Sequence, residues 1–132
     1  MKLLLISFLL LSVTGFAQKA KLDKEFSLKA GGETLVKEAG LKIRFGSVVE
    51  DSRCPEGVNC IWAGNGKITV TLKKGRQKAA SFELNTMLEP KGITYQGYEI
   101  KLVKLDPYPK NNMTVKKSDY VATLVVSKKK KA

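Results

Sequence analysis

The chain has 132 residues, with 24 lysines and arginines, 12 aspartates and glutamates and no histidine, so its net charge is +12 at neutral pH. The lack of histidine excludes Ser-His-Asp and Cys-His catalysis, histidine general bases and histidine metal ligands. The charge favours polyanionic or acidic partners. The lysines are nevertheless spread along the chain and often alternate with apolar residues. A strand whose exposed face carries lysines would give the same pattern without any acidic partner.

The first 17 residues have the pattern of a secretory signal peptide. Lys2 precedes an apolar run from Leu3 to Val13, and small residues follow at Gly15 and Ala17. The run is shorter than the roughly 20 apolar residues that span a bilayer, so an uncleaved anchor or a buried N-terminal strand is the less favoured alternative. No cysteine follows the run as a lipid attachment point. We expect cleavage after Ala17, which leaves a charge of +11, and export to the periplasm, the cell surface or the medium.

Residues 18–132 are expected to form one β domain, because apolar residues recur there with the period of two that is typical of strands. We expect a bulge at Gly46, after which Val49 resumes the buried, odd-numbered set. The last strand is apolar on both faces and is placed at the centre of a sheet. Residues 128–132 are a basic tail that is expected to fray. The expected strands cover residues 25–30, 33–36, 41–49, 67–73, 80–84, 93–95, 98–105 and 119–127.

Seven or eight short strands separated by regular turns indicate an all-β fold, either an antiparallel sandwich or a small closed barrel. We favour a sandwich of immunoglobulin-like architecture. The likeness covers architecture alone, because the two cysteines are too close in sequence to bridge two sheets.

Cys54 and Cys60 are the only cysteines, and in an exported chain such a pair favours one disulfide. The ring is short, and chain-entropy reasoning gives it about 2 kcal/mol, so we expect it to shape a loop rather than hold the domain together. Pro55 and Gly57 suit a tight path. The alternatives are weaker: redox pairs have closer spacing, and a zinc site or a nucleophilic thiol would need further ligands or a histidine.

The stretch around the cysteines carries the candidate binding residues. The oxygens of Glu50, Asp51, Glu56 and Asn59 could in principle bind calcium, although turn capping and a pair between Asp51 and Arg53 explain them more simply. That pair is expected to be exposed at the loop entrance, where it would contribute at most about 1 kcal/mol. Trp62 is expected to pack in the core over the disulfide, and its alternative role is an exposed binding anchor. The candidate loop spans residues 50–64, and its named members are Glu50, Asp51, Arg53, Pro55, Glu56, Val58, Asn59 and Trp62.

Three motifs resemble one family of small exported bacterial proteins and lipoproteins of uncharacterised role. They are Asp51-Ser52-Arg53-Cys54-Pro55 followed by Cys60-x-Trp62-Ala63-Gly64; Tyr98-x-Ile100-x-Leu102 leading into Leu105-Asp106-Pro107-Tyr108-Pro109; and Asp119-Tyr120-x-Ala122-Thr123-Leu124. The resemblance covers most of the mature chain, which lacks the lipidation cysteine of the lipoprotein members. It implies an exported all-β domain and no catalytic mechanism.

We therefore expect a non-catalytic binding module that uses loop 50–64 and needs no cofactor. The expected partner is an envelope protein or an acidic glycan. A protease inhibitor that inserts Pro55 to Val58 is one alternative. A binder of polyanions, such as glycan, lipopolysaccharide or nucleic acid, is another; nucleic acid is disfavoured because the tyrosines do not interleave with basic residues. An enzyme using Glu50 and Glu56 is disfavoured because no catalytic constellation is recognisable.

Overall fold

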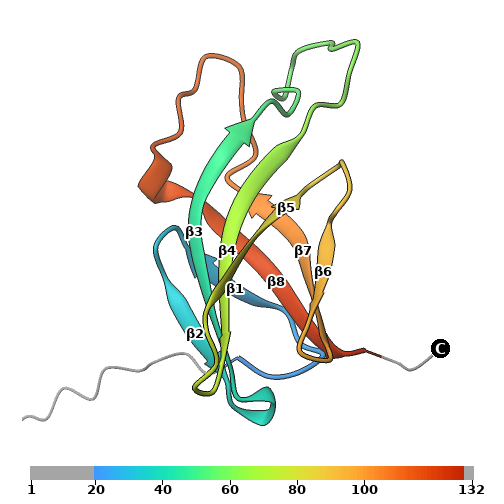
Figure 1. Cartoon of the computed structure of the whole chain (residues 1–132). Coiled ribbons are helices and arrows are strands. Elements are labelled where there is room, and N and C mark those ends of the chain that lie inside the picture. The colour runs from blue at the N-terminus through green and yellow to red at the C-terminus, as the bar shows by residue number, and fades with distance from the viewer. Residues whose placement is uncertain (1–19, 130–132) are drawn as a thin grey trace, which may run out of the picture.

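Two antiparallel sheets of four strands each pack face to face in the computed structural model, which describes residues 20–129 (Figure 1). Within this range the only helices are two short 3-10 turns, η1 (Lys37–Ala39) and η2 (Lys117–Asp119). The strands are β1 (Phe26–Lys29), β2 (Glu33–Val36), β3 (Leu41–Asp51), β4 (Gly66–Lys74), β5 (Ala80–Asn85), β6 (Gly92–Tyr95), β7 (Tyr98–Asp106) and β8 (Val121–Lys128).

The sheets have the strand orders β2-β3-β4-β5 and β1-β8-β7-β6, and they share no strand. This arrangement confirms the expected sandwich and differs from the closed barrel, in which the sheet edges would pair. Strand β8 lies between β1 and β7, as its two apolar faces indicated. The β6–β7 hairpin turns at Gln96 and Gly97, whose φ angles of 50° and 82° are left-handed, as two-residue hairpin turns require.

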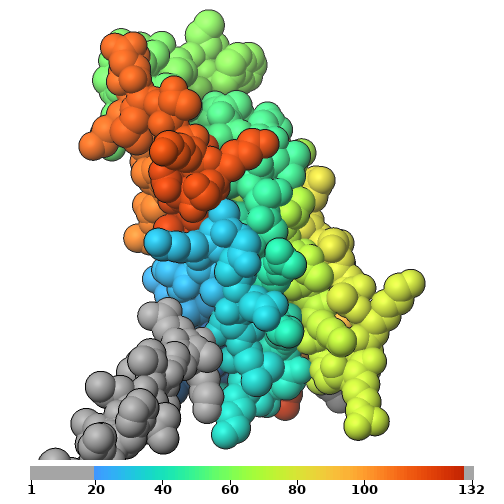
Figure 2. All heavy atoms as spheres, turned by 90° about the vertical axis from the view of Figure 1, so that its left-hand side faces the viewer, coloured from blue at the N-terminus to red at the C-terminus, as the bar shows by residue number. Residues whose placement is uncertain are grey.

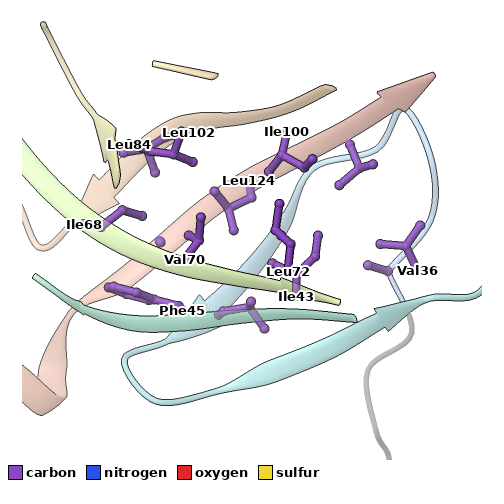
Figure 3. Close-up of a cluster of buried hydrophobic side chains, with 14 of the residues drawn as sticks. Val36, Ile43, Phe45, Ile68, Val70, Leu72, Leu84, Ile100, Leu102 and Leu124 are labelled. Atoms are coloured by element: carbon purple, nitrogen blue, oxygen red, sulfur yellow. The ribbon is translucent and has the colours of Figure 1, made fainter. Parts of the chain in front are cut away.

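The core lies between the sheets, where inward side chains alternate along each strand (Figure 3). Ile68, Val70 and Leu72 of β4 are fully buried and face Ile100 of β7 and Leu124 of β8, which are also fully buried. Each such side chain contributes about 1.5–3 kcal/mol through removal from water. The alternation predicted for residues 67–73 is therefore confirmed.

Two bulges in β3 reverse this alternation. Its pairing with β4 shifts between Phe45 and Ser47 and again between Val48 and Glu50. Each bulge adds one residue, which moves the following side chains to the other face. Val48 is consequently buried and Val49 is 54% exposed. The bulge at Gly46 was predicted correctly, but the placement of Val49 in the core was wrong.

The second bulge also turns Asp51 toward the interior at the end of β3, where it meets side chains from other loops. The predicted signal peptide, residues 1–17, and the last tail residues, 130–132, lie outside the described residues. Across residues 20–129, no helix has the length and hydropathy needed to cross a bilayer.

Candidate functional site

Three loops meet at one end of the sandwich. Residues 52–65 connect β3 to β4, residues 86–91 connect β5 to β6, and residues 107–120 connect β7 to β8 (Figure 1). Figure 2 shows the first loop, in green, beside the last, in orange and red, at the top of the molecule. All of the candidate binding residues belong to the first of these loops or to the adjoining end of β3.

The β3–β4 loop is braced from its base to its tip. The amide of Ser52 donates to the carbonyl of Asn65 at 2.8 Å, and the amide of Cys54 donates to the carbonyl of Ala63 at 3.0 Å. The predicted disulfide between Cys54 and Cys60 is present and closes the next turn. These connections extend the hairpin beyond the sheet and hold the backbone of the loop in one conformation.

Gly64 makes this path possible. Its φ is +74°, and a Cβ atom at this position would lie 1.8 Å from the carbonyl oxygen of Ser52 on the opposite side of the hairpin. Any side chain would therefore collide with backbone that cannot move aside. Gly57 lies in a turn where the amide of Val58 donates to the carbonyl of Pro55. Its φ is +80° and the space around it is open. Glycine is therefore favoured here by the left-handed backbone and not by a lack of room for a side chain.

A buried ion pair anchors the base of the loop. Arg53 donates from Nε to Asp51 Oδ1 at 2.8 Å and from Nη2 to Asp51 Oδ2 at 2.9 Å. Its remaining donors reach the carbonyls of Leu105 at 2.6 Å and Pro107 at 3.0 Å. The pair was predicted, but its expected exposure was wrong, since the side chains are only 6% and 12% exposed. Arg53 thus ties β3 to the end of β7.

Tyr120 completes this network by donating its hydroxyl to Asp51 Oδ2 at 2.9 Å. Burial alone would raise the pKa of Asp51, but the hydrogen bonds from Arg53 and Tyr120 and the Arg53 charge outweigh it and lower that pKa. Burial, together with the bond to Asp51, raises the pKa of Tyr120 to about 12. Both groups therefore stay in one protonation state near neutral pH.

The β7–β8 loop supports one side of the disulfide ring. Tyr108 donates its hydroxyl to the carbonyl of Cys54 at 2.7 Å, and its ring centroid lies 5.2 Å from the guanidinium carbon of Arg53. The amide of Glu56 donates to the carbonyl of Pro109 at 3.0 Å. The sequence pattern did not indicate this support, because each contact joins loops that are distant in the chain.

Asn65 supports the other side. Its Nδ2 donates to Asn85 Oδ1 at 2.9 Å, and its Oδ1 accepts from the amides of Met87 and Leu88 at 3.1 and 3.2 Å. Both asparagines are buried. Nothing in the sequence pattern identified Asn65, because its role depends on a loop that is distant in the chain.

A group of apolar side chains is exposed on this braced end. Trp62 is 80% exposed, so the expectation that it packs in the core over the disulfide was wrong. Ile61 is 91% exposed, and Met87 and Leu88 of the β5–β6 loop are each more than half exposed. We call Ile61, Trp62, Met87 and Leu88 the Trp62 surface.

Two shallow hollows flank the backbone of residues 63–64. One, of about 290 Å³, lies between Trp62, Met87 and Leu88 and is bordered by Glu50 and Asn65. The other, of about 380 Å³, also borders residues 63–64 and has Met87, Val103 and Tyr108 in its lining. Met87 contributes to both, so the Trp62 surface continues into two apolar depressions.

The structure divides the candidate loop residues into two groups. Asp51 and Arg53 are taken up by the internal ion pair. Glu50, Glu56, Val58, Asn59 and Trp62 are exposed, and Pro55 is half-buried. Among residues 20–129, no three His, Cys, Asp or Glu side chains gather closely enough to hold a metal ion. Asp51, one of the four oxygen-bearing residues considered for calcium, instead binds Arg53 and Tyr120.

Comparison of the chain with protein-family models, with curated proteins and with solved structures found no match. The resemblance of its motifs to exported bacterial proteins stays a prediction.

Proposed function

We propose that this protein is an exported, non-catalytic binding module that holds a partner protein through the Trp62 surface. The observation that carries the proposal is the 80% exposure of Trp62 on a loop that a disulfide, an ion pair and two neighbouring loops hold in place. Tryptophan is among the residues that contribute most to binding at protein interfaces. Contiguous exposed apolar side chains mark interaction sites, whereas single ones are common on protein surfaces.

The rigidity of the loop supports this function. A loop that already has its bound conformation loses little entropy on association. The hydrogen bonds of Cys54, Glu56 and Asn65 and the disulfide provide that order before any partner binds. Export is supported by the signal-peptide pattern and by the disulfide itself.

The chemistry around Trp62 favours a protein over a glycan or another polyanion. Its neighbours in the surface are Ile61, Met87 and Leu88, which are aliphatic and suit an apolar protein contact. The one charged residue in the lining of the hollow beside Trp62 is Glu50, which would repel an acidic glycan there. The partner is therefore expected to present an apolar cleft that accepts the indole.

The protease-inhibitor alternative receives less support. A segment inserted into a protease cleft would need to stand free of its own domain. Pro55 to Val58 instead forms a turn, and the amide of Glu56 is bonded to the carbonyl of Pro109.

The proposal is tested by capture from an envelope extract with the immobilised mature protein. The variant is Trp62→Ala, and the matched control is Leu35→Ala, an apolar residue 45% exposed on β2. We expect one protein to be retained by the wild type and the control. Loss of Trp62 should weaken the purified pair at least about tenfold, as removal of a binding hot spot does. Equal retention by all three proteins, or retention of nothing, would contradict the proposal.

A further inference from the structure

The end of the sandwich opposite the Trp62 surface is strongly basic. Four contacts bring its segments together: Gly75 with Gly40, Lys129 with Gly97, Asp23 with Val126, and Lys74 Nζ, which lies 5.1 Å from the ring centroid of Tyr98. The β4–β5 turn and the last described residues lie at this end in Figure 1. We call it the basic end, and its cationic residues are Lys21, Lys24, Lys37, Lys74, Arg76, Lys78, Lys128 and Lys129.

The charge of the basic end is not balanced locally. Its eight cations face three carboxylates, Asp23, Glu25 and Glu38, which leaves a net charge of +5. In residues 20–129, the ion pairs within 4.0 Å all involve other cations, namely Lys42, Arg53, Lys67, Lys101 and Lys104. The end with the Trp62 surface has five cations and five carboxylates across its three loops and the end of β3. The excess charge of the molecule is therefore polarised.

We propose that the basic end docks on an anionic phospholipid surface. Clusters of four to eight basic residues bind anionic lipid headgroups, and each residue adds to the affinity. The β2–β3, β4–β5 and β6–β7 turns and the end of β8 lie at this end of the molecule (Figure 1), so their cationic residues can meet a plane together. None of the exposed large apolar side chains belongs to its described segments, so the contact is electrostatic and does not insert into the bilayer.

Lipid fits this end better than nucleic acid. Proteins that hold single strands use exposed aromatic rings on which bases stack. The basic end has two tyrosines, which pair across the β6–β7 turn. Tyr95 is buried, and Tyr98 is half-buried and lies beside Lys74.

Docking through the basic end fixes the orientation of the molecule. Strand β3 runs from Leu41, beside the basic end, to Asp51, at the base of the disulfide loop. Its 11 residues extend roughly 35 Å at the usual rise of a strand. Trp62 would therefore face away from the bilayer. The lipid contact and the protein contact use different ends of the molecule, so a variant can lose one kind of binding and keep the other.

The test is co-sedimentation of the mature protein with vesicles of phosphatidylcholine alone or mixed with phosphatidylglycerol. The variant Arg76→Glu/Lys78→Glu changes the basic end. The matched control, Lys116→Glu/Lys117→Glu, makes the same charge change in the β7–β8 loop, at the end of the sandwich that carries the Trp62 surface, and all four side chains are exposed. We expect binding only to the anionic vesicles, weakened by added salt. The basic-end variant should lose at least about tenfold in affinity, and the control less than about twofold.

Three results would overturn the proposal. The first is equal loss in both variants, since net charge alone would then explain binding. The second is no binding to anionic vesicles at low salt, including the case where a single-stranded oligonucleotide binds instead. The third is quenching of Trp62 fluorescence by brominated lipid, because the opposite end would then face the bilayer.

Discussion

At the scale of single residues, the Asp51 carboxylate is the group on which the loop depends most. It balances the buried charge of Arg53 and accepts the hydroxyl of Tyr120. Removing one partner of a buried pair leaves the other uncompensated, at a cost of about 3–5 kcal/mol. We therefore expect Asp51→Asn to lower the free energy of unfolding by an amount in that range, measured by urea denaturation at neutral pH.

Glu50→Gln is the control, because the neighbouring Glu50 is exposed, and such changes usually stay within about 0.5 kcal/mol. The folded-state pKa of Asp51 lies below its ordinary value of 3.8. The stabilisation by its charge is thus complete above that value and is lost as the pH falls through the folded-state pKa. The difference in free energy of unfolding between wild type and Asp51→Asn should therefore shrink as the pH falls. Equal free energies of unfolding for the two proteins at neutral pH would contradict the role of the pair.

Tyr120 gives the opposite pH dependence. Its pKa is raised from 10.0 to about 12 in the folded protein, so its stabilising effect is complete below pH 10 and is lost as the pH rises toward 12. We expect wild type to lose more stability than Tyr120→Phe over this interval, measured by urea denaturation at successive pH values. Parallel curves for the two proteins would show that the hydroxyl does not bond to Asp51.

The sequence identified the pair between Asp51 and Arg53 but misplaced it. Charged residues two apart near a turn usually lie in water, and only the second bulge, which turns Asp51 inward, brings the pair into the interior. Trp62 was misplaced for the opposite reason. A large aromatic beside a disulfide normally finds a core, but the loop carries it beyond the sheets, where no core reaches.

At the scale of elements, the bulges in β3 determine which residues face inward. Because Val48 is 6% exposed and Val49 is 54% exposed, an aspartate should be tolerated only at position 49. We expect Val48→Asp to cost more than about 3 kcal/mol, since it buries an unpaired charge. Val49→Asp should cost less than about 1 kcal/mol in the same thermal or urea unfolding measurement. The reverse order would mean that the odd-numbered alternation predicted from the sequence continues through the strand.

The disulfide acts on one element rather than on the whole fold. It closes a ring with a sequence separation of 6, and chain-entropy reasoning gives it about 2 kcal/mol. We expect Cys54→Ala/Cys60→Ala to unfold cooperatively with at most that loss, because Arg53, Tyr108 and Asn65 still hold the loop. Hydrogen exchange should rise most for the amides of residues 55–62, and in β4 and β8 it should rise by no more than the loss of global stability requires. Loss of cooperative folding would contradict a local role.

Strand positions were the most predictable feature, because the period of two is a local signal. The hairpins from residue 66 to residue 85 and from residue 92 to residue 106 lie where the pattern placed them. Contacts such as Tyr108 with Cys54 and Asn65 with Asn85 were not predictable, since each joins loops from different parts of the chain. The site is therefore defined by topology as much as by the cysteine motif.

At the scale of the whole molecule, folding separates features that are mixed in the sequence. Lysines spread along the chain gather at the basic end, while apolar residues from two loops form the Trp62 surface at the other. The composition gave the net charge but not its uneven distribution between the two ends of the sandwich. That distribution depends on which turns lie at the same end. The architecture thus allows one protein to have two independent contacts.

Tryptophan fluorescence of the purified mature protein, with acrylamide quenching, measures whether the braced loop presents Trp62 to the solvent. The chain has a single tryptophan, so the signal has one source. We expect red-shifted emission and ready quenching of the oxidised protein, and little change after reduction, because Trp62 is already in water. A blue-shifted, poorly quenched spectrum would place the indole in a core, where it could not serve as a binding residue.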